Sequence, residues 1–92
     1  MLNMVKTALR VTTEAFDMEI QNYIDACIDE MQGLGVTAAR QDSMDPQITT
    51  AVIAYCKWKF GQNAEADRWQ RAYEAMLGSL KMRSGYTDWG DV

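Results

Sequence analysis

The chain has 92 residues, of which 48% are hydrophobic and 24% are charged, and its net charge is -4 at pH 7. This length predicts one small domain with a thin core, and the balance of apolar and charged residues excludes a wholly disordered chain. The acidic charge argues against a protein that grips DNA through a basic surface, but it suits a surface that DNA must pass without sticking, because like charges repel the phosphates.

Hydrophobic periodicity predicts helices almost throughout, because the β-branched alternation typical of strands is missing. The first helix is expected over residues 3–10, with Asn3 as its cap and with Leu2, Val5 and Leu9 on one side. This helix has only about two turns, so its stability must depend on packing against the rest of the chain.

The second helix is expected over residues 17–33, with Asp17 as its cap. Gly33 and Gly35 should end it, since glycine readily takes the left-handed conformation that follows many helices. Its apolar residues fall within an arc of roughly 140° on the helical wheel. These residues are Ile20, Tyr23, Ile24, Cys27, Ile28, Met31 and Leu34.

The third helix is expected over residues 46–60. Asp45 should cap it, and Pro46 takes the first helical position, where a missing N–H costs nothing. Apolar residues cover nearly its whole circumference, and only Thr50 and Lys57 hold a polar stripe. The pattern predicts either a central helix or a helix with one side on its own core and the other on a neighbouring subunit.

One flank of this third helix carries Ala51, Ala54 and Trp58, and we expect it to contact a neighbouring subunit. The opposite flank should face the core of its own chain. Asp29 and Glu30, near the end of the second helix, are further candidates for the subunit interface, because an acidic surface there would suit a basic partner.

The sequence KWKF at residues 57–60 alternates basic and aromatic residues, a pattern found in proteins that bind nucleic acids. Trp58 and Phe60 fall on opposite flanks of the helix and so form no single platform for bases. Lysines near this end of the helix also complement its dipole. A small helical nucleic-acid binder, acting as a regulator or packaging recognition subunit, is the alternative function. Its contact surface would comprise Lys57, Trp58, Lys59, Arg68 and Arg71.

The fourth helix is expected over residues 64–82, and the helical domain as a whole over residues 1–83. Its apolar stripe comprises Trp69, Ala72, Tyr73, Met76, Leu77 and Leu80. Residues 84–92 form a short C-terminal tail with two large aromatics, Tyr86 and Trp89, outside any helical period. This tail either binds a partner, since tryptophan is enriched at interfaces, or folds back onto its own core.

Few residues in the chain suggest catalysis. There is no histidine, and no phosphate loop, nucleophile motif or metal-ligand spacing occurs, so we expect no enzyme, no cofactor and no metal. Asp25 and Asp29 are expected on a solvated face, with a basic partner as the alternative. Cys27 and Cys56 are expected as small buried hydrophobes rather than as a disulfide or a reactive thiol. No signal peptide or segment of about 20 apolar residues is present, which predicts a protein without membrane contact, soluble and cytoplasmic when made.

Four segments taken in order resemble a known family. They are LRV at residues 9–11, FDMEIQNYIDACIDEMQGLGV at 16–36, DPQITTAVIAYCKWKFG at 45–61 and AYEAMLGSLKMRSGY at 72–86. Their order, spacing and total length are similar to those of the small head–tail connector proteins of long-tailed bacteriophages, also called adaptor or head-completion proteins. Each motif alone is a loose helical pattern, and the resemblance covers nearly the whole chain.

The resemblance implies an all-α protomer, a small bundle of about four helices, that assembles into a closed ring of about a dozen copies. Such a ring is a structural part of the virion, assembled in the host cytoplasm, and it extends the DNA channel from the portal toward the tail. The implied partners are further copies of the chain, the portal protein and a tail-completion or head-closure protein. DNA passes through without specific binding. Residues 84–92, with Tyr86 and Trp89, match the segment that grips the portal in related adaptors.

Overall fold

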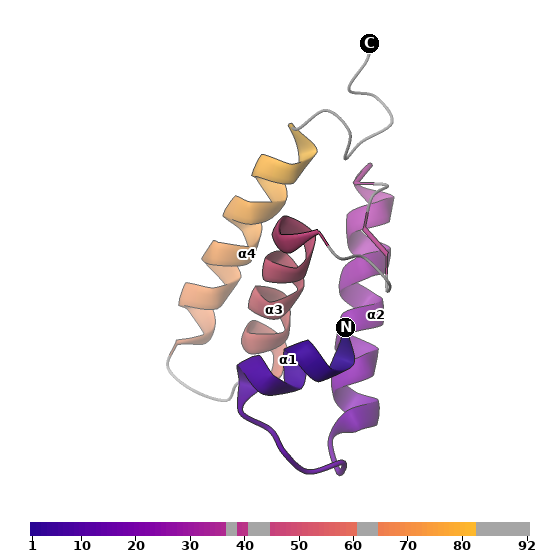
Figure 1. Cartoon of the computed structure of the whole chain (residues 1–92). Coiled ribbons are helices and arrows are strands. Elements are labelled where there is room, and N and C mark those ends of the chain that lie inside the picture. The colour runs from indigo at the N-terminus through magenta and orange to yellow at the C-terminus, as the bar shows by residue number, and fades with distance from the viewer. Residues whose placement is uncertain (37–38, 41–44, 61–64, 83–92) are drawn as a thin grey trace.

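The computed structural model describes residues 1–36, 39–40, 45–60 and 65–82. Within these residues the chain forms four α-helices and no strand (Figure 1). The helices are α1 (Leu2–Leu9), α2 (Asp17–Gly33), α3 (Pro46–Phe60) and α4 (Ala66–Lys81). The predicted all-α fold is therefore confirmed, and every helix begins and ends within two residues of its expected bounds. The expected tail, residues 84–92, lies outside the described residues.

Helix α3 is the centre of the arrangement. It lies between α2 and α4 and packs on both, while α1 crosses the lower part of the molecule and packs on α2 and α3 (Figure 1). Helices α2 and α4 run in one direction and α3 in the other. An apolar surface nearly all round the helix needs partners on several sides, and the neighbouring helices supply them. Of the two arrangements open for this helix, the structure has the central one.

The core is built around this helix. Its buried residues are Ile48, Thr49, Ala51, Val52, Ala54, Tyr55 and Cys56. From α2 the predicted apolar arc supplies Ile20, Ile24, Cys27, Ile28 and Met31. The two edges of that arc are less covered, because Tyr23 is half-buried and Leu34 is exposed. Helix α4 adds Tyr73, Leu77 and Leu80, and α1 adds Val5.

Of the expected helix caps, the one on α3 is confirmed. The Asp45 Oδ1 atom accepts hydrogen bonds from the backbone N–H groups of Gln47, at 2.8 Å, and Ile48, at 3.4 Å. The other two are wrong. Helix α1 already begins at Leu2, so Asn3 lies inside it. Asp17 is the first helical residue of α2 rather than its cap, and its carboxylate instead pairs with Lys6 Nζ of α1 at 2.6 Å. Because this ion pair joins two helices, the sequence around the start of α2 does not predict it.

Among the described residues, two helices are followed by a left-handed residue. After α2 this residue is Gly35, with φ 96°, as the sequence predicted, whereas Gly33 is the last helical residue and is not left-handed. After α1 it is Arg10, with φ 59°, a conformation that strains a residue with a Cβ atom. The N–H of Val11 then reaches back to the Lys6 carbonyl at 2.9 Å, and the N–H of Arg10 to that of Thr7 at 3.1 Å, which satisfies two end carbonyls.

Replacing Arg10 with glycine is expected to raise the free energy of unfolding by up to about 1 kcal/mol, because glycine takes this conformation without strain. Arg10→Ala is the matched control: it removes the same side chain and keeps the strained Cβ. Urea denaturation followed by circular dichroism measures both. A glycine variant no more stable than the alanine variant would contradict the expectation.

Candidate functional site

Two kinds of site are absent from the described residues. Among them, no group of three or more His, Cys, Asp or Glu side chains is arranged to hold a metal ion. None of the four described helices has the length and apolar character that crossing a bilayer requires.

Three aromatic rings join α3 to α4. The Tyr55 and Tyr73 ring centroids lie 5.1 Å apart in an edge-to-face arrangement, and Trp58 lies 5.6 Å from Tyr55 and 6.3 Å from Tyr73. Such pairs add to the burial of apolar area when they are edge-on or tilted. Phe60 lies on the other side of the helix, 5.3 Å from Phe16. The predicted separation of Trp58 from Phe60 is therefore confirmed.

The basic residues near the end of α3 contact aromatic rings of the same protomer. Lys59 Nζ stands 3.9 Å from the centroid of the Trp58 ring, and Lys57 Nζ stands 4.4 Å from that of Trp69. Arg68 approaches the same Trp69 ring at 5.6 Å. Amines over ring faces are attracted by the ring quadrupole. The lysines of KWKF thus form cation–π contacts inside this chain, and Trp58 and Trp69 each already have a cation over the ring.

The two thiols lie in the core, as predicted. Cys27 and Cys56 are free and buried. Burial raises the pKa of each thiol to about 12, so that neither forms appreciable thiolate at neutral pH. Both therefore behave as small hydrophobic residues rather than as nucleophiles.

A hydrogen bond links the two outer helices past α3. The Tyr73 hydroxyl of α4 donates to Glu30 Oε1 of α2 at 2.9 Å. Burial, together with the nearby Cys27 and Glu30, raises the pKa of the Tyr73 hydroxyl, so it stays protonated as a donor at any ordinary pH. Glu30, named from the sequence as a subunit contact, therefore also has a partner within its own chain.

The residues expected at the subunit interface lie in different surroundings. Ala51 and Ala54 are 0% and 1% exposed, so they belong to the core of the protomer and offer no surface to a second copy. Trp58 is half-buried in the aromatic cluster, while Asp29 is exposed on α2. Tyr86 and Trp89, the residues expected to dock on the portal, lie in the tail outside the described residues.

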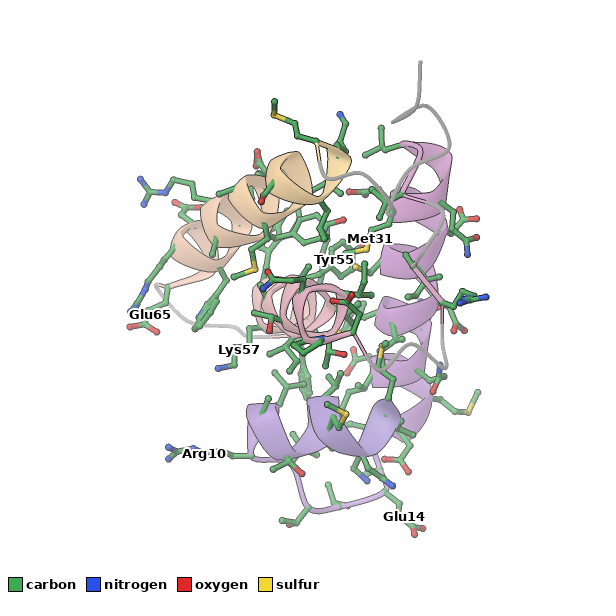
Figure 2. The ribbon with its side chains drawn as sticks, turned by 45° about the horizontal axis from the view of Figure 1, so that its top comes forward. Arg10, Glu14, Met31, Tyr55, Lys57 and Glu65 are labelled. Atoms are coloured by element: carbon green, nitrogen blue, oxygen red, sulfur yellow. The ribbon has the colours of Figure 1, made fainter. Side chains whose placement is uncertain are left out.

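A groove of about 320 Å³ opens where α1 ends, α3 ends and α4 begins. Its lining is Ala8, Leu9, Arg10, Val11, Lys57, Phe60, Glu65 and Trp69. Figure 2 shows Arg10, Lys57 and Glu65 on one side of the molecule. No segment of the sequence carries a signal for this groove, because its walls come from three helices.

A family model described as phage connector protein matches residues 1–87, and so spans all four helices and leaves out only the last five residues. Searches of the curated proteins and of the solved structures gave no match.

Proposed function

The chain belongs to the phage connector protein family, and we propose that its copies form a ring between the portal and the tail of a phage particle, extending the channel through which the DNA passes. Family membership gives it a structural role as a component of the virion. This family is one of structural proteins rather than enzymes. The ring, its size of about a dozen copies and its place in the channel are the proposal.

The observation that carries the proposal is the length of the family match, which includes every described helix. Size supports it as well. A chain of 92 residues buries only about 60–65% of the surface that its unfolded form exposes, so its stability alone is modest. Contact with identical neighbours adds stability through mass action, and a ring gives every copy two such neighbours.

Charge supports the passage of DNA. The net charge is -4, and the cations of KWKF are held over tryptophan rings of the same chain. A channel wall with this balance repels phosphates instead of binding them. DNA would then slide through the ring without the salt-dependent attachment that a basic surface produces.

The subunit and portal contacts are also part of the proposal. With Ala51 and Ala54 in the core, the subunit contact is assigned to exposed positions, of which Asp29, Glu30 and the open edge of Trp58 came from the sequence. Tyr86 and Trp89 remain the candidates for docking on the portal. The closest partners in the virion would be the portal protein and a tail-completion or head-closure protein.

Assembly tests this function directly. We expect the purified protein to self-associate as its concentration rises, and to form rings when the portal protein of the same phage is added. Native mass spectrometry and sedimentation measure the copy number with and without portal. A chain that stays monomeric at every concentration and never binds portal would overturn the proposal.

Gel retardation of a DNA duplex at low salt is the companion measurement. The proposed function expects no retardation. A shift that weakens steeply with added salt would favour the nucleic-acid binder instead, with Lys57, Lys59, Arg68 and Arg71 as its contacts.

A further inference from the structure

The two helices at the edges of the layer each expose one long face. On α2 the exposed residues recur every three or four positions along one side, and we call them the α2 face: Met18, Asn22, Ala26, Asp29 and Gly33. On α4 an equivalent row forms the α4 face: Arg68, Arg71, Ala75, Gly78 and Met82. Because α3 separates the two helices, these faces point to opposite sides of the protomer (Figures 1 and 2).

Both faces are shaped for a close neighbour. Each has small residues along its length, Ala26 and Gly33 on α2 and Ala75 and Gly78 on α4. A Cβ atom added to Gly33 or Gly78 would meet nothing within 4 Å, so no contact inside the protomer calls for glycine there. Glycine within a helix is destabilising relative to alanine. Small residues let two helix axes approach closely, which gives these positions a purpose if another helix packs on them.

Each face also has an exposed methionine at one end, which favours contact with a protein neighbour. Met18 and Met82 are 88% and 89% exposed. Methionine is flexible and polarizable, and it adapts to the surface of a partner. Each face thus combines a small centre with a large apolar residue at one end.

The charges of helix α2 and of the α4 face are complementary. Helix α2 carries five acidic residues and no lysine or arginine: Asp17, Glu19, Asp25, Asp29 and Glu30. Of these, Asp29 belongs to the α2 face, and the other four lie outside it on the same helix. The α4 face presents two guanidinium groups, Arg68 and Arg71, while Asp67 and Glu74 lie along one edge of it. Opposite charges across an interface steer the approach of the partners and fix their register.

The register suits a ring. Helices α2 and α4 run in the same direction, and the first half of α4 lies level with the middle of α2 (Figure 1). A rotation about an axis roughly along these helices therefore brings the first half of α4 in one copy, which contains Arg68 and Arg71, level with the middle of α2 in the next copy. Asp29 lies one helical turn beyond that middle, toward the C-terminal end of α2.

We propose that the α4 face of one copy packs on the α2 face of the next. This inference rests on the proposed ring and names the surfaces that form it. The two faces differ and lie on opposite sides, so the contact is head-to-tail and repeats around a closed ring. A single helix pair buries less than the roughly 800 Å² per partner of a stable complex, so the contact is weak until the ring closes or the portal holds it.

Crosslinking between the two faces tests the contact. Cysteines replace Gly33 and Gly78, which are both exposed and lie near the C-terminal ends of α2 and α4, and a short bismaleimide joins those that meet. The native Cys27 and Cys56 stay unreactive because they are buried. A chain with both G33C and G78C should give a ladder of dimers, trimers and larger species. A mixture of the two single variants should stop at dimers, and G33C paired with the exposed T50C on α3 should give no ladder.

The possible results separate the inference from the proposed function. Dimers from G33C alone or from G78C alone would show like faces meeting, and would overturn the head-to-tail contact. Wild-type rings without a crosslink between the two faces would overturn it and leave the ring standing. A chain that neither self-associates nor binds portal would overturn both.

A charge swap gives an independent measurement on rings assembled with portal. Asp29→Arg or Arg71→Asp alone should weaken association about tenfold, because each places like charges face to face. The two together should restore it. Lys81→Glu, which changes an exposed charge of α4 outside the α4 face, is the matched control and should leave association unchanged. Failure of the double variant to recover, while both singles weaken association and remain folded, would contradict the pairing.

Discussion

Replacing Tyr73 with alanine is expected to lower the free energy of unfolding by about 3–5 kcal/mol. The ring is 1% exposed, lies 5.1 Å from Tyr55 and 6.3 Å from Trp58, and is the largest fully buried side chain among the described residues. Its removal leaves a cavity between α3 and α4 and takes away the hydrogen bond to Glu30. A domain of this size has a stability of roughly 5–14 kcal/mol, so the loss is a large part of the total.

Tyr73→Phe is the control for this prediction, because it keeps the ring and removes only the hydroxyl. We expect it to lose about 1 kcal/mol, the usual net value of one hydrogen bond. Chemical denaturation of both variants at a concentration where the protein is monomeric separates packing from hydrogen bonding. An alanine variant within 1 kcal/mol of the phenylalanine variant would mean that α4 does not depend on this ring.

Replacing Trp58 with alanine is expected to cost about 2 kcal/mol of folding stability. The ring is half-buried, so less area is lost than at Tyr73, but it packs on two tyrosines and lies under the Lys59 amine at 3.9 Å. Thermal and chemical denaturation of the monomer measure this cost. An unchanged free energy of unfolding would show that Trp58 does not help to hold α3 to α4.

The same variant tests the proposed role of Trp58 in assembly. Sedimentation compares the association of the Trp58→Ala variant with that of the wild type. Both are measured without denaturant, at a concentration where the variant is folded. A further loss of association places the open edge of the ring in a subunit contact, and equal association assigns Trp58 to the fold alone. Lys59→Ala serves as the matched control, since it keeps the aromatic cluster and removes only the cation–π contacts of Lys59 with Trp58 and Tyr55, together about 1 kcal/mol.

The candidate contacts show which features the sequence predicts and which it does not. The wheel correctly separated Trp58 from Phe60 and placed the cysteines on apolar arcs. The wheel predicted that the third helix has two apolar sides, but it did not predict what packs on each side. The side with Ala51 and Ala54 was assigned to a neighbouring subunit, whereas it is covered inside the protomer. A helical pattern records which side avoids water, and it is silent about which chain supplies the cover.

Local signals determined the helices themselves. Periodicity, the Asp45–Pro46 start and the Gly35 end act between residues a few positions apart, so they are legible in the sequence. The tertiary structure alone decided the contacts between distant residues. Tyr73 meets Glu30 across 43 positions, and the Asp17 carboxylate turns to Lys6 instead of capping its own helix. The faces left open at the two edges of the molecule, on α2 and α4, likewise emerge only after α3 has taken its place between them, because a helix face is exposed or buried according to what packs on it.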